Sequence, residues 1–191
     1  MILKSKGRCS CSQCKDLPST LDDELEIAAF LKREDPRDVL VALRPEVHFE
    51  NLNQDWVIGT SSVRRQALLR HYVPGVRIKD IRGNVDTRLA KLEAGDYDGI
   101  ILAFAGLKRL GLDHHIRQKL NLSTFTPAIG QGAIAVVVRK GSGFREQIHK
   151  ILHHAPTGFA LEAERSYLRT LRGGCHTPAF AFANVIGTRF P

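Results

Sequence analysis

From Trp56 onward, short apolar runs alternate with segments in which apolar residues recur at helical spacing. Each apolar run is short enough for a single buried strand, and turn residues bound it. Ser62 precedes the first helical segment as a suitable N-cap, and Gly95 closes the second as a C-cap. This alternation predicts βαβ units and a mainly parallel sheet. The expected strands are 56–58, 76–81 and 97–103, and the expected helices are 63–72 and 85–92.

The segments on either side are less regular. Residues 33–38 are charged and interrupted by Pro36, which suits a connector. The last expected helix is followed by one expected strand, and one helix with one strand does not close a domain. The C-terminal region is therefore expected to be an unfinished unit. The elements expected in these flanks are strands 39–43, 133–138 and 180–186 and helices 144–154 and 158–171.

The long final helix leads to Gly173-Gly174 and then to Cys175. Two glycines after a helix allow a sharp turn, which would expose the thiol. Arg169, Arg172 and His176 lie nearby in sequence, and positive charge favours the reactive thiolate. A covalent role for Cys175 is one hypothesis. The alternative is a small buried residue that fills a gap in the core.

The composition is that of an ordinary soluble globular protein, with 43% hydrophobic and 25% charged residues. No apolar run approaches the ~20 residues needed to span a bilayer. The N-terminus lacks the apolar segment of a secretory signal, so we expect a cytoplasmic protein. Four cysteines in 191 residues do not suggest a disulfide scaffold. A formal net charge of +8 favours anionic partners.

The first fourteen residues contain Cys9, Cys11 and Cys14 in a C-x-C-x-x-C pattern. Thiolates at this spacing could hold zinc or part of an iron–sulfur cluster. A closed zinc site needs a fourth ligand, and no second C-x-x-C pair is present. A frayed tail without metal is therefore the preferred interpretation.

Arginine residues recur where the expected strands lead into helices. In an open parallel sheet, ligands bind beyond the carboxyl ends of the strands, where helix N-termini also offer unpaired N–H groups. A guanidinium matches a carboxylate or phosphate with a fork of donors. We therefore expect these arginines to share an anionic ligand, with the hydroxyls of Thr60, Ser61 and Ser62 capping the first helix. The arginines are Arg64, Arg65, Arg82, Arg88 and Arg109.

The positive charge also has two alternative interpretations. Each arginine could instead pair with a surface carboxylate such as Asp80, Asp86 or Glu93. A nucleic-acid site is the weaker alternative, because most aromatic residues fall at core-like positions and do not interleave with basic ones. The chain also lacks the G-x-x-x-x-G-K-[ST] and G-x-G-x-x-G phosphate-binding motifs.

Several long motifs follow one another along the chain. They are Lys-Asp-Leu-Pro at 15–18, Arg-Glu-Asp-Pro-Arg-Asp at 33–38, Gly-Thr-Ser-Ser-Val-Arg-Arg-Gln at 59–66, Arg-Gly-Asn-Val-Asp-Thr-Arg-Leu at 82–89, Leu-Ala-Phe-Ala-Gly-Leu-Lys-Arg-Leu-Gly at 102–111, Pro-Ala-Ile-Gly-Gln-Gly-Ala at 127–133 and Gly-Gly-Cys at 173–175. Together they resemble the porphobilinogen deaminase family, also called hydroxymethylbilane synthases, of the tetrapyrrole pathway. The resemblance extends over nearly everything from Lys15 to the end of the chain.

The resemblance implies an α/β fold with type-2 periplasmic-binding-protein-like domains, which have mainly parallel sheets, and part of a small α+β C-terminal domain. Family members carry roughly half a domain before the Lys-Asp motif, so the chain is expected to be truncated at both ends. Residues 37–125 would form a complete domain 2. The other expected segments are an unmatched tail at 1–14, a remnant of domain 1 at 15–36 and 126–150, and a partial domain 3 at 151–191.

The same resemblance implies a dipyrromethane cofactor held by a thioether to Cys175. Family enzymes add four porphobilinogen molecules to it, release ammonia at each step and finally release hydroxymethylbilane for haem biosynthesis. Each pyrrole carries an acetate and a propionate, which would be the anion expected at the arginines. The implied cofactor- and substrate-binding residues are Lys15, Thr60, Ser62, Arg64, Arg65, Arg82, Arg88, Arg109 and Gln131.

Asp16 is the implied catalytic carboxylate. It would deliver a proton to the departing amine and then stabilise the cationic intermediate. Without the resemblance, a turn-capping aspartate before Leu-Pro is the simpler interpretation. The resemblance implies a monomer that acts on the small molecule porphobilinogen, with no metal, nucleic acid or membrane. The alternatives are a truncated chain that is inactive alone and a non-catalytic anion-binding remnant of the fold.

Overall fold

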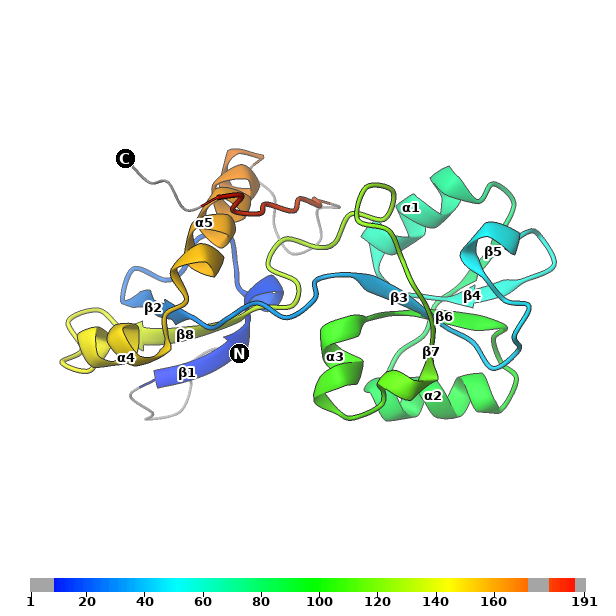
Figure 1. The fold of residues 1–191 in the computed structure, drawn as a ribbon, viewed down its shortest axis with the longest axis horizontal. Coiled ribbons are helices and arrows are strands. Elements are labelled where there is room, and N and C mark those ends of the chain that lie inside the picture. The colour runs from blue at the N-terminus through cyan, green and yellow to red at the C-terminus, as the bar shows by residue number, and fades with distance from the viewer. Residues whose placement is uncertain (1–8, 172–178, 188–191) are drawn as a thin grey trace. The chain divides into compact units, whose positions relative to one another are not determined.

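The computed structural model describes residues 9–171 and 179–187, and the chain divides into two units. Unit 1 contains Met1–Glu34 and Ala128–Pro191, and unit 2 contains Asp35–Pro127. The chain therefore leaves unit 1 once and returns to it once (Figure 1). Unit 2 extends slightly beyond the 37–125 expected for domain 2.

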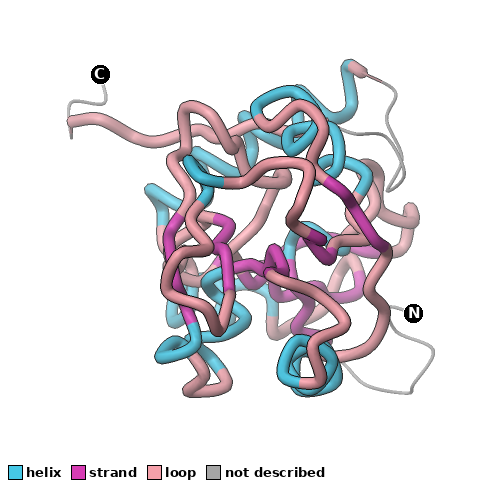
Figure 2. Tube along the Cα trace, turned by 90° about the vertical axis from the view of Figure 1, so that its right-hand side faces the viewer, coloured by secondary structure: helices cyan, strands magenta, loops and turns pink. Residues whose placement is uncertain are grey.

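Unit 2 is built on a mixed sheet with the strand order β5-β4-β6-β3-β7. The strands are short, and Figure 2 shows them as brief magenta segments among the cyan helices and pink loops. Two of the strands, β3 and β6, consist mostly of apolar residues, as the sequence pattern predicts. All of β3 and most of β6 are buried. The strands are β3 (Asp38–Val41), β4 (Val57–Gly59), β5 (Arg77–Lys79), β6 (Gly99–Ala103) and β7 (Ile116–Lys119).

The α/β class is confirmed, but the expectation of a mainly parallel sheet is wrong outside β5, β4 and β6. β4 runs parallel to both β5 and β6, whereas β3 runs antiparallel to β6 and to β7. A helical crossover joins β4 to β5 and β5 to β6, and such connections produce parallel pairs. β3 instead begins directly after the connector, and β7 leads into the segment that returns to unit 1. No helix precedes β3 in unit 2, whereas β7 follows β6 through the helix α3 (Phe104–Arg109) but pairs with β3 instead of β6.

Three helices cover the sheet of unit 2: α1 (Val63–Tyr72), α2 (Val85–Glu93) and α3 (Phe104–Arg109). Caps fix where the first two begin. The Ser62 side chain accepts a hydrogen bond from the Arg65 backbone N–H, and Asn84 accepts one from the Thr87 N–H at 2.8 Å. The N-cap predicted at Ser62 is therefore confirmed.

The alternation of side chains along β3 creates two cores in unit 2. Leu40 belongs to a cluster with Leu69 of α1, while Val39 and Val41 belong to a second cluster with Leu92 of α2. Successive side chains of a strand point to opposite faces, so α1 covers one face and α2 the other (Figure 1). The start of β3, at Asp38, is thereby held between two packed layers.

Unit 1 contains an antiparallel sheet with the order β1-β8-β2. Its strands are β1 (Cys9–Gln13), β2 (Leu25–Phe30) and β8 (Ile134–Arg139), and its helices are α4 (Arg145–Leu152) and α5 (Ala155–Thr170). Both outer strands pair antiparallel with β8. No helix in the described part of the chain is long and apolar enough to cross a bilayer.

The frayed tail predicted for residues 1–14 is wrong for residues 9–13, which form β1. Cys9 pairs with Val138, and Gln13 pairs with Ile134. The strand has no apolar periodicity, and its side chains are exposed or half-buried. Its backbone is ordered by a partner strand more than a hundred residues away in the sequence. The local sequence therefore does not predict this strand.

The structure does not separate residues 151–191 from unit 1 as a third domain. Leu161 of α5 is fully buried in one core with Phe30, Cys14 and Val137. The predicted strand at 180–186 is also wrong, because Phe180 makes a single bridge with Ala128. The helix expected at 158–171 begins earlier, at Ala155, where His154 is the N-cap.

Candidate functional site

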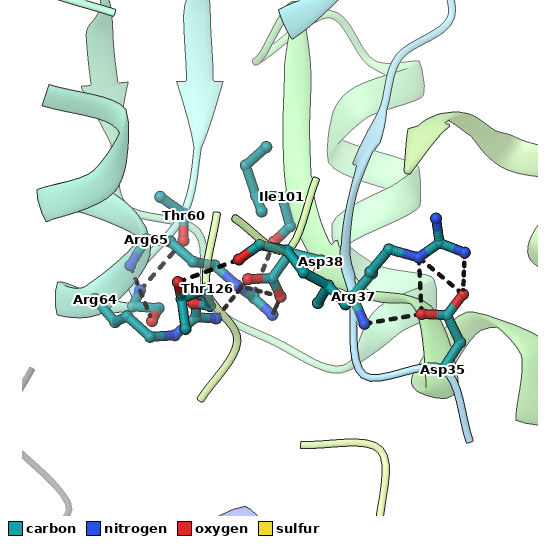
Figure 3. A network of polar contacts seen from close by, with 10 residues as sticks. Asp35, Arg37, Asp38, Thr60, Arg64, Arg65, Ile101 and Thr126 are labelled. Carbon is teal, nitrogen blue, oxygen red and sulfur yellow. Dashed lines mark hydrogen bonds and ion pairs between the residues drawn. The ribbon is translucent and has the colours of Figure 1, made fainter. Parts of the chain in front are cut away.

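A buried carboxylate in unit 2 binds two of the predicted arginines. Asp38 begins β3 and is completely buried, while Arg64 and Arg65 lie in the first turn of α1. Arg64 Nη2 lies 2.5 Å from Asp38 Oδ2, and Arg65 donates to Oδ1 from Nη2 at 2.8 Å and Nε at 3.1 Å (Figure 3). Two guanidinium groups therefore share one carboxylate.

Backbone carbonyl groups complete part of this arrangement. Arg64 Nη1 donates to the Thr126 carbonyl at 2.7 Å, and Arg65 Nη1 donates to the Ile101 carbonyl at 2.9 Å (Figure 3). Carbonyl groups carry no formal charge, so they orient the guanidinium groups without neutralising them. Two positive charges against the one negative charge of Asp38 give this three-residue cluster a surplus of one positive charge.

The pKa values in the cluster reflect burial and this surplus. Burial by itself would raise the pKa of Asp38, but Arg65 and Arg64 outweigh it and hold that pKa below its ordinary value. Burial lowers the pKa of Arg64, which Asp38 opposes and the charge of Arg65 reinforces. Burial and then the charge of Arg65 lower the pKa of Arg88. Arg88 therefore lies within the electrostatic field of the same cluster.

One donor of the cluster has no acceptor. Arg64 is 6% exposed, yet its Nε has no hydrogen-bond partner within the described ranges 9–171 and 179–187. Leaving a buried donor unpaired costs about 1–3 kcal/mol, more when the group is charged. Such a group in a native protein calls for an explanation, and a bound acceptor is a direct one. The cluster thus offers both a net positive charge and an unpaired donor.

The hydroxyl residues lie at the N-terminus of α1, as the sequence predicts. Thr60 is almost fully buried, and its Oγ1 accepts a hydrogen bond from the Ser62 N–H at 3.3 Å. Ser61 Oγ donates to the Ile81 carbonyl at 2.8 Å and accepts from the Ile81 N–H at 2.9 Å. These bonds fix the loop that begins α1, and with it the first-turn arginines.

The other three arginines are less buried. Arg82 follows β5 and is exposed, and Arg109 is the exposed last residue of α3. Arg88 is half-buried in α2, where its Nε donates to the Gly83 carbonyl at 2.9 Å. The alternative of pairing with a surface carboxylate such as Asp80 does not hold for the two buried arginines, because their partner is Asp38.

The remaining predicted residues belong to unit 1. Lys15 and Asp16 lie in a short 3-10 helix, Cys14–Asp16, directly after β1, with Lys15 half-buried and Asp16 exposed. Gln131 is 1% exposed, and its carbonyl accepts a hydrogen bond from Arg33 Nε at 2.9 Å. Cys175 lies outside the residues that the structure describes.

A buried ion pair holds the loop that carries Gln131. Glu164 of α5 is 1% exposed and accepts from Arg33 Nη1 at 2.5 Å and Nη2 at 3.2 Å. It also accepts from the Gly130 N–H at 2.8 Å and the Ala183 N–H at 2.9 Å. Gly130 has a φ of 73°, and a Cβ there would lie 2.8 Å from the Cys14 sulfur. The loop therefore packs directly against the turn of Lys15 and Asp16.

Arg165, the next residue of α5, holds the other end of that turn. It is 5% exposed, and its Nη2 donates to the carbonyls of Pro18 at 2.8 Å and Ser19 at 3.1 Å. Burial raises the pKa of the Cys14 thiol, which the charges of Arg165 and Arg33 partly offset. The thiol therefore stays protonated near neutral pH, in the role of a packing residue beside the Asp16 turn.

Four residues of these clusters are not singled out by the sequence pattern: Asp38, Arg33, Glu164 and Arg165. Asp38 and Arg33 belong to the charged segment 33–38, which by its composition resembles a connector. Glu164 lies three residues after the buried Leu161, on the same helix face. A charged residue at a core-facing position of an amphipathic helix is the signal that could identify it.

The N-terminal cysteines do not converge. Cys9 and Cys11 are exposed on β1, whereas Cys14 is buried against Gly130. Among the described residues, no group of three or more His, Cys, Asp or Glu side chains is placed to hold a metal ion.

Comparison with known proteins identifies similar sequences. Residues 1–147 match the family model described as "Porphobilinogen deaminase, dipyromethane cofactor binding domain". The match includes residues 1–14, contrary to the expected unmatched tail, and it ends before Cys175. Two curated relatives are named porphobilinogen deaminase. The one from Desulfosudis oleivorans is 45% identical over 177 residues, which are 92% of this chain and 57% of the relative. The one from Coxiella burnetii is 46% identical over 176 residues, which are 92% of this chain and 56% of the relative.

The chain thus spans just over half the length of these curated relatives. Among solved structures, it is similar to a putative methionine-binding lipoprotein from Bacillus subtilis, with a TM-score of 0.45 and 11% identity over 69% of this chain and 62% of the other. It is also similar to a substrate-binding domain of a putative amino acid transporter from Streptococcus pneumoniae, with a TM-score of 0.44 and 15% identity over 78% and 60% of the two chains.

Proposed function

Because the chain belongs to the porphobilinogen deaminase family, we propose that it carries the dipyrromethane-binding half of a hydroxymethylbilane synthase. The proposed reaction condenses four porphobilinogen molecules stepwise onto a cysteine-linked dipyrromethane, releases ammonia, and then releases hydroxymethylbilane for haem biosynthesis. The observation that carries the proposal is the surplus positive charge around Asp38, with its unpaired Arg64 Nε.

The donor set at Asp38 fits the proposed cofactor. Each pyrrole unit of a dipyrromethane carries an acetate and a propionate, and carboxylates are the acceptors that guanidinium groups bind best. The surplus charge would be neutralised by one ligand carboxylate, and the unpaired Nε would gain an acceptor. The residues proposed to bind the carboxylates are Arg64, Arg65, Arg82, Arg88 and Arg109, with Thr60, Ser62, Lys15 and Gln131 adding hydrogen bonds.

Asp16 is the proposed proton donor and counter-charge. Its carboxyl is exposed to solvent, while the turn beneath it is fixed by Cys14 and Arg165. A positioned carboxyl can protonate a departing amine and then stabilise the cation that remains. The role of the fixed turn is to hold this carboxylate in one place between successive additions. When bound, the dipyrromethane supplies the tethered pyrrole chain to which substrate is added.

Cys175 is the proposed attachment point of the cofactor. The support is that α5, which precedes Gly173-Gly174-Cys175 in the sequence, is anchored in unit 1 through Leu161 and Glu164. Charge at the last turn of this helix comes from Arg169, which favours a thiolate nearby.

Intact-mass spectrometry tests the proposal. The chain would be produced in cells that make porphobilinogen, and we expect an added mass equal to a dipyrromethane. Cys175→Ser should abolish the adduct, whereas Cys9→Ser, the control for an exposed thiol, should retain it. Unmodified protein together with no turnover of porphobilinogen would contradict the proposal for this chain.

A non-catalytic anion-binding protein is the second candidate, and the observation that favours it is that the charges and the unpaired donor at Asp38 can bind a carboxylate without any chemical step. Binding of a dipyrromethane dicarboxylate without an adduct and without ammonia release would support it. In both candidates we propose a cytoplasmic monomer with no nucleic-acid or membrane partner. The support for the absence of a nucleic-acid partner is that the surplus charge at Asp38 is buried and not displayed as a surface stripe. A salt-dependent nucleic-acid titration tests that part of the proposal, and light scattering tests the monomer.

A further inference from the structure

A hollow of about 210 Å³ lies in unit 1, lined by α4, α5 and one edge of β2. It contains none of the residues proposed to bind the carboxylates of the cofactor or substrate, although Arg165 also holds the Asp16 turn and Arg169 lies in the last turn before the Cys175 segment. Its volume would hold several water molecules or one small ligand, since a water occupies roughly 30 Å³ of the liquid. The polar side chains that line it are Arg145, His149, His153, Glu162, Arg165 and Arg169.

Basic residues of both helices converge on this hollow. Arg145 and His149 are four residues apart on α4, and Arg165 and Arg169 are four residues apart on α5. Residues at this spacing share one face of a helix, so each helix turns its basic pair toward the hollow. Glu162 is the acidic side chain among the lining residues. Like charges repel, and packing two basic faces together is unfavourable unless an anion lies between them.

The existing contacts neutralise only part of this charge. Arg145 Nε donates to Glu26 Oε2 at 2.9 Å, in an exposed ion pair. The Nη2 group of Arg165 donates to the uncharged carbonyls of Pro18 and Ser19, which hold the buried guanidinium in place. Arg169 is exposed in the last turn of α5. The guanidinium groups that line the hollow therefore outnumber the carboxylates that line it.

The two histidines are held in definite orientations. His149 Nδ1 lies 2.9 Å from the Ala28 carbonyl, so this nitrogen carries the proton in the neutral ring. His153 Nδ1 accepts from the Phe30 N–H at 3.3 Å, so in its neutral ring the proton is on Nε2. The rings stack with their centroids 4.2 Å apart. They form one wall of the hollow and bring no negative charge to it.

We propose that the hollow between α4 and α5 is a binding site for a small oxyanion, such as inorganic phosphate or a carboxylate. The ligand is held by Arg145 and Arg169 at the rim and by the field of the buried Arg165. The inference does not depend on the proposed carboxylate-binding residues, because it involves neither the arginines at Asp38 nor Asp16. It predicts that unit 1 has an anion site of its own.

NMR titration of the 191-residue chain tests the site. Inorganic phosphate, acetate and chloride would be added in separate experiments at constant ionic strength and pH. We expect the Hε1 signals of His149 and His153 to shift with phosphate or acetate and not with chloride. The titration that gives the larger shift identifies whether the site prefers phosphate or a carboxylate. His114 and His115, whose rings also lie 4.2 Å apart but in unit 2, provide the control pair and should not shift. Equal shifts in both pairs, or none at His149 and His153, would overturn the proposal.

A matched pair of variants provides the second test. Arg169→Ala should weaken binding of the oxyanion about tenfold, the effect of one charge-assisted hydrogen bond. Arg70→Ala removes an arginine from the equivalent last turn of α1 and should leave the affinity unchanged. Both residues are exposed, so neither change should prevent folding. Equal affinities of the two variants would refute a site at Arg169.

Discussion

Two buried ion-pair clusters, one in each unit, differ in how their charges balance. In unit 1, Glu164 receives the fork of a single arginine, Arg33, together with two backbone N–H groups. In unit 2, Asp38 receives two arginines, and a third, Arg88, lies in their field. The first cluster is balanced one to one. The second has a surplus positive charge and an unpaired Arg64 Nε. We propose that this difference distinguishes a cluster that binds a ligand from one that only stabilises the fold.

The largest expected effect comes from removing the shared carboxylate of unit 2. Asp38→Asn leaves two buried guanidinium groups without this counter-charge, and we expect a loss of about 3–5 kcal/mol in the free energy of unfolding. Urea denaturation measures it. Asp80→Asn, an exposed aspartate that accepts a hydrogen bond from Gln66, is the control and should change stability by less than about 0.5 kcal/mol. Similar losses for the two variants would show that Asp38 is not central to unit 2.

A smaller loss is expected for the one-to-one cluster. Glu164→Gln removes the charge opposite a single arginine, Arg33, while the amide still accepts hydrogen bonds, so we expect about 3 kcal/mol. Glu162→Gln, an exposed change two residues earlier in the same helix, should be nearly neutral. The comparison of the two clusters would fail if Glu164→Gln cost more than Asp38→Asn under the same denaturant.

Arg88→Met tests whether an arginine beside the Asp38 cluster contributes to ligand binding and not to stability. Burial and the charge of Arg65 both disfavour the charged Arg88, so its removal should change the free energy of unfolding by less than about 0.5 kcal/mol. Affinity for a dipyrromethane dicarboxylate should nevertheless fall about tenfold, as one charge-assisted hydrogen bond is lost. Calorimetric titration and denaturation of the same sample measure both quantities. Unchanged affinity would remove Arg88 from the proposed site.

The smallest effect is a pH dependence located in unit 1. Burial, and next the charge of His149, lower the pKa of His153 from its ordinary 6.5. The unfolded chain therefore binds a proton at a higher pH than the folded protein, so stability is lost as the pH falls below about 6.5. The slope from this one group is at most about 1.4 kcal/mol per pH unit. Asp38 has a lowered pKa, so it stays ionised in this range.

His153→Asn should flatten the decline of stability between neutral pH and about pH 5, the range where an ordinary histidine titrates. His114→Asn, in unit 2, is the control and should leave the slope as it is. Thermal denaturation across this pH range is the measurement. A decline that persists unchanged in the His153 variant would place the acid sensitivity elsewhere in the molecule.

Local sequence was enough to predict the elements around the arginines. The Ser62 cap, the apolar runs of β4 and β6 and the helical spacing of α1 depend on neighbours within a few residues, which is why the pattern identified them. Motif order was enough to identify the family. The division of the chain near residues 35 and 127 lies close to the predicted bounds because the charged connector marks the first crossing.

Other features depended on residues distant in sequence. Cys9–Gln13 became a strand because β8 pairs with it, and β3 is antiparallel because it lies beside β6 without a helical crossover. The arginine pattern predicted an anion site, but only the fold placed Asp38 between Arg64 and Arg65 and gave their cluster its surplus charge. Helical period and caps are encoded by adjacent residues. Charge balance is decided by which side chains tertiary packing brings face to face.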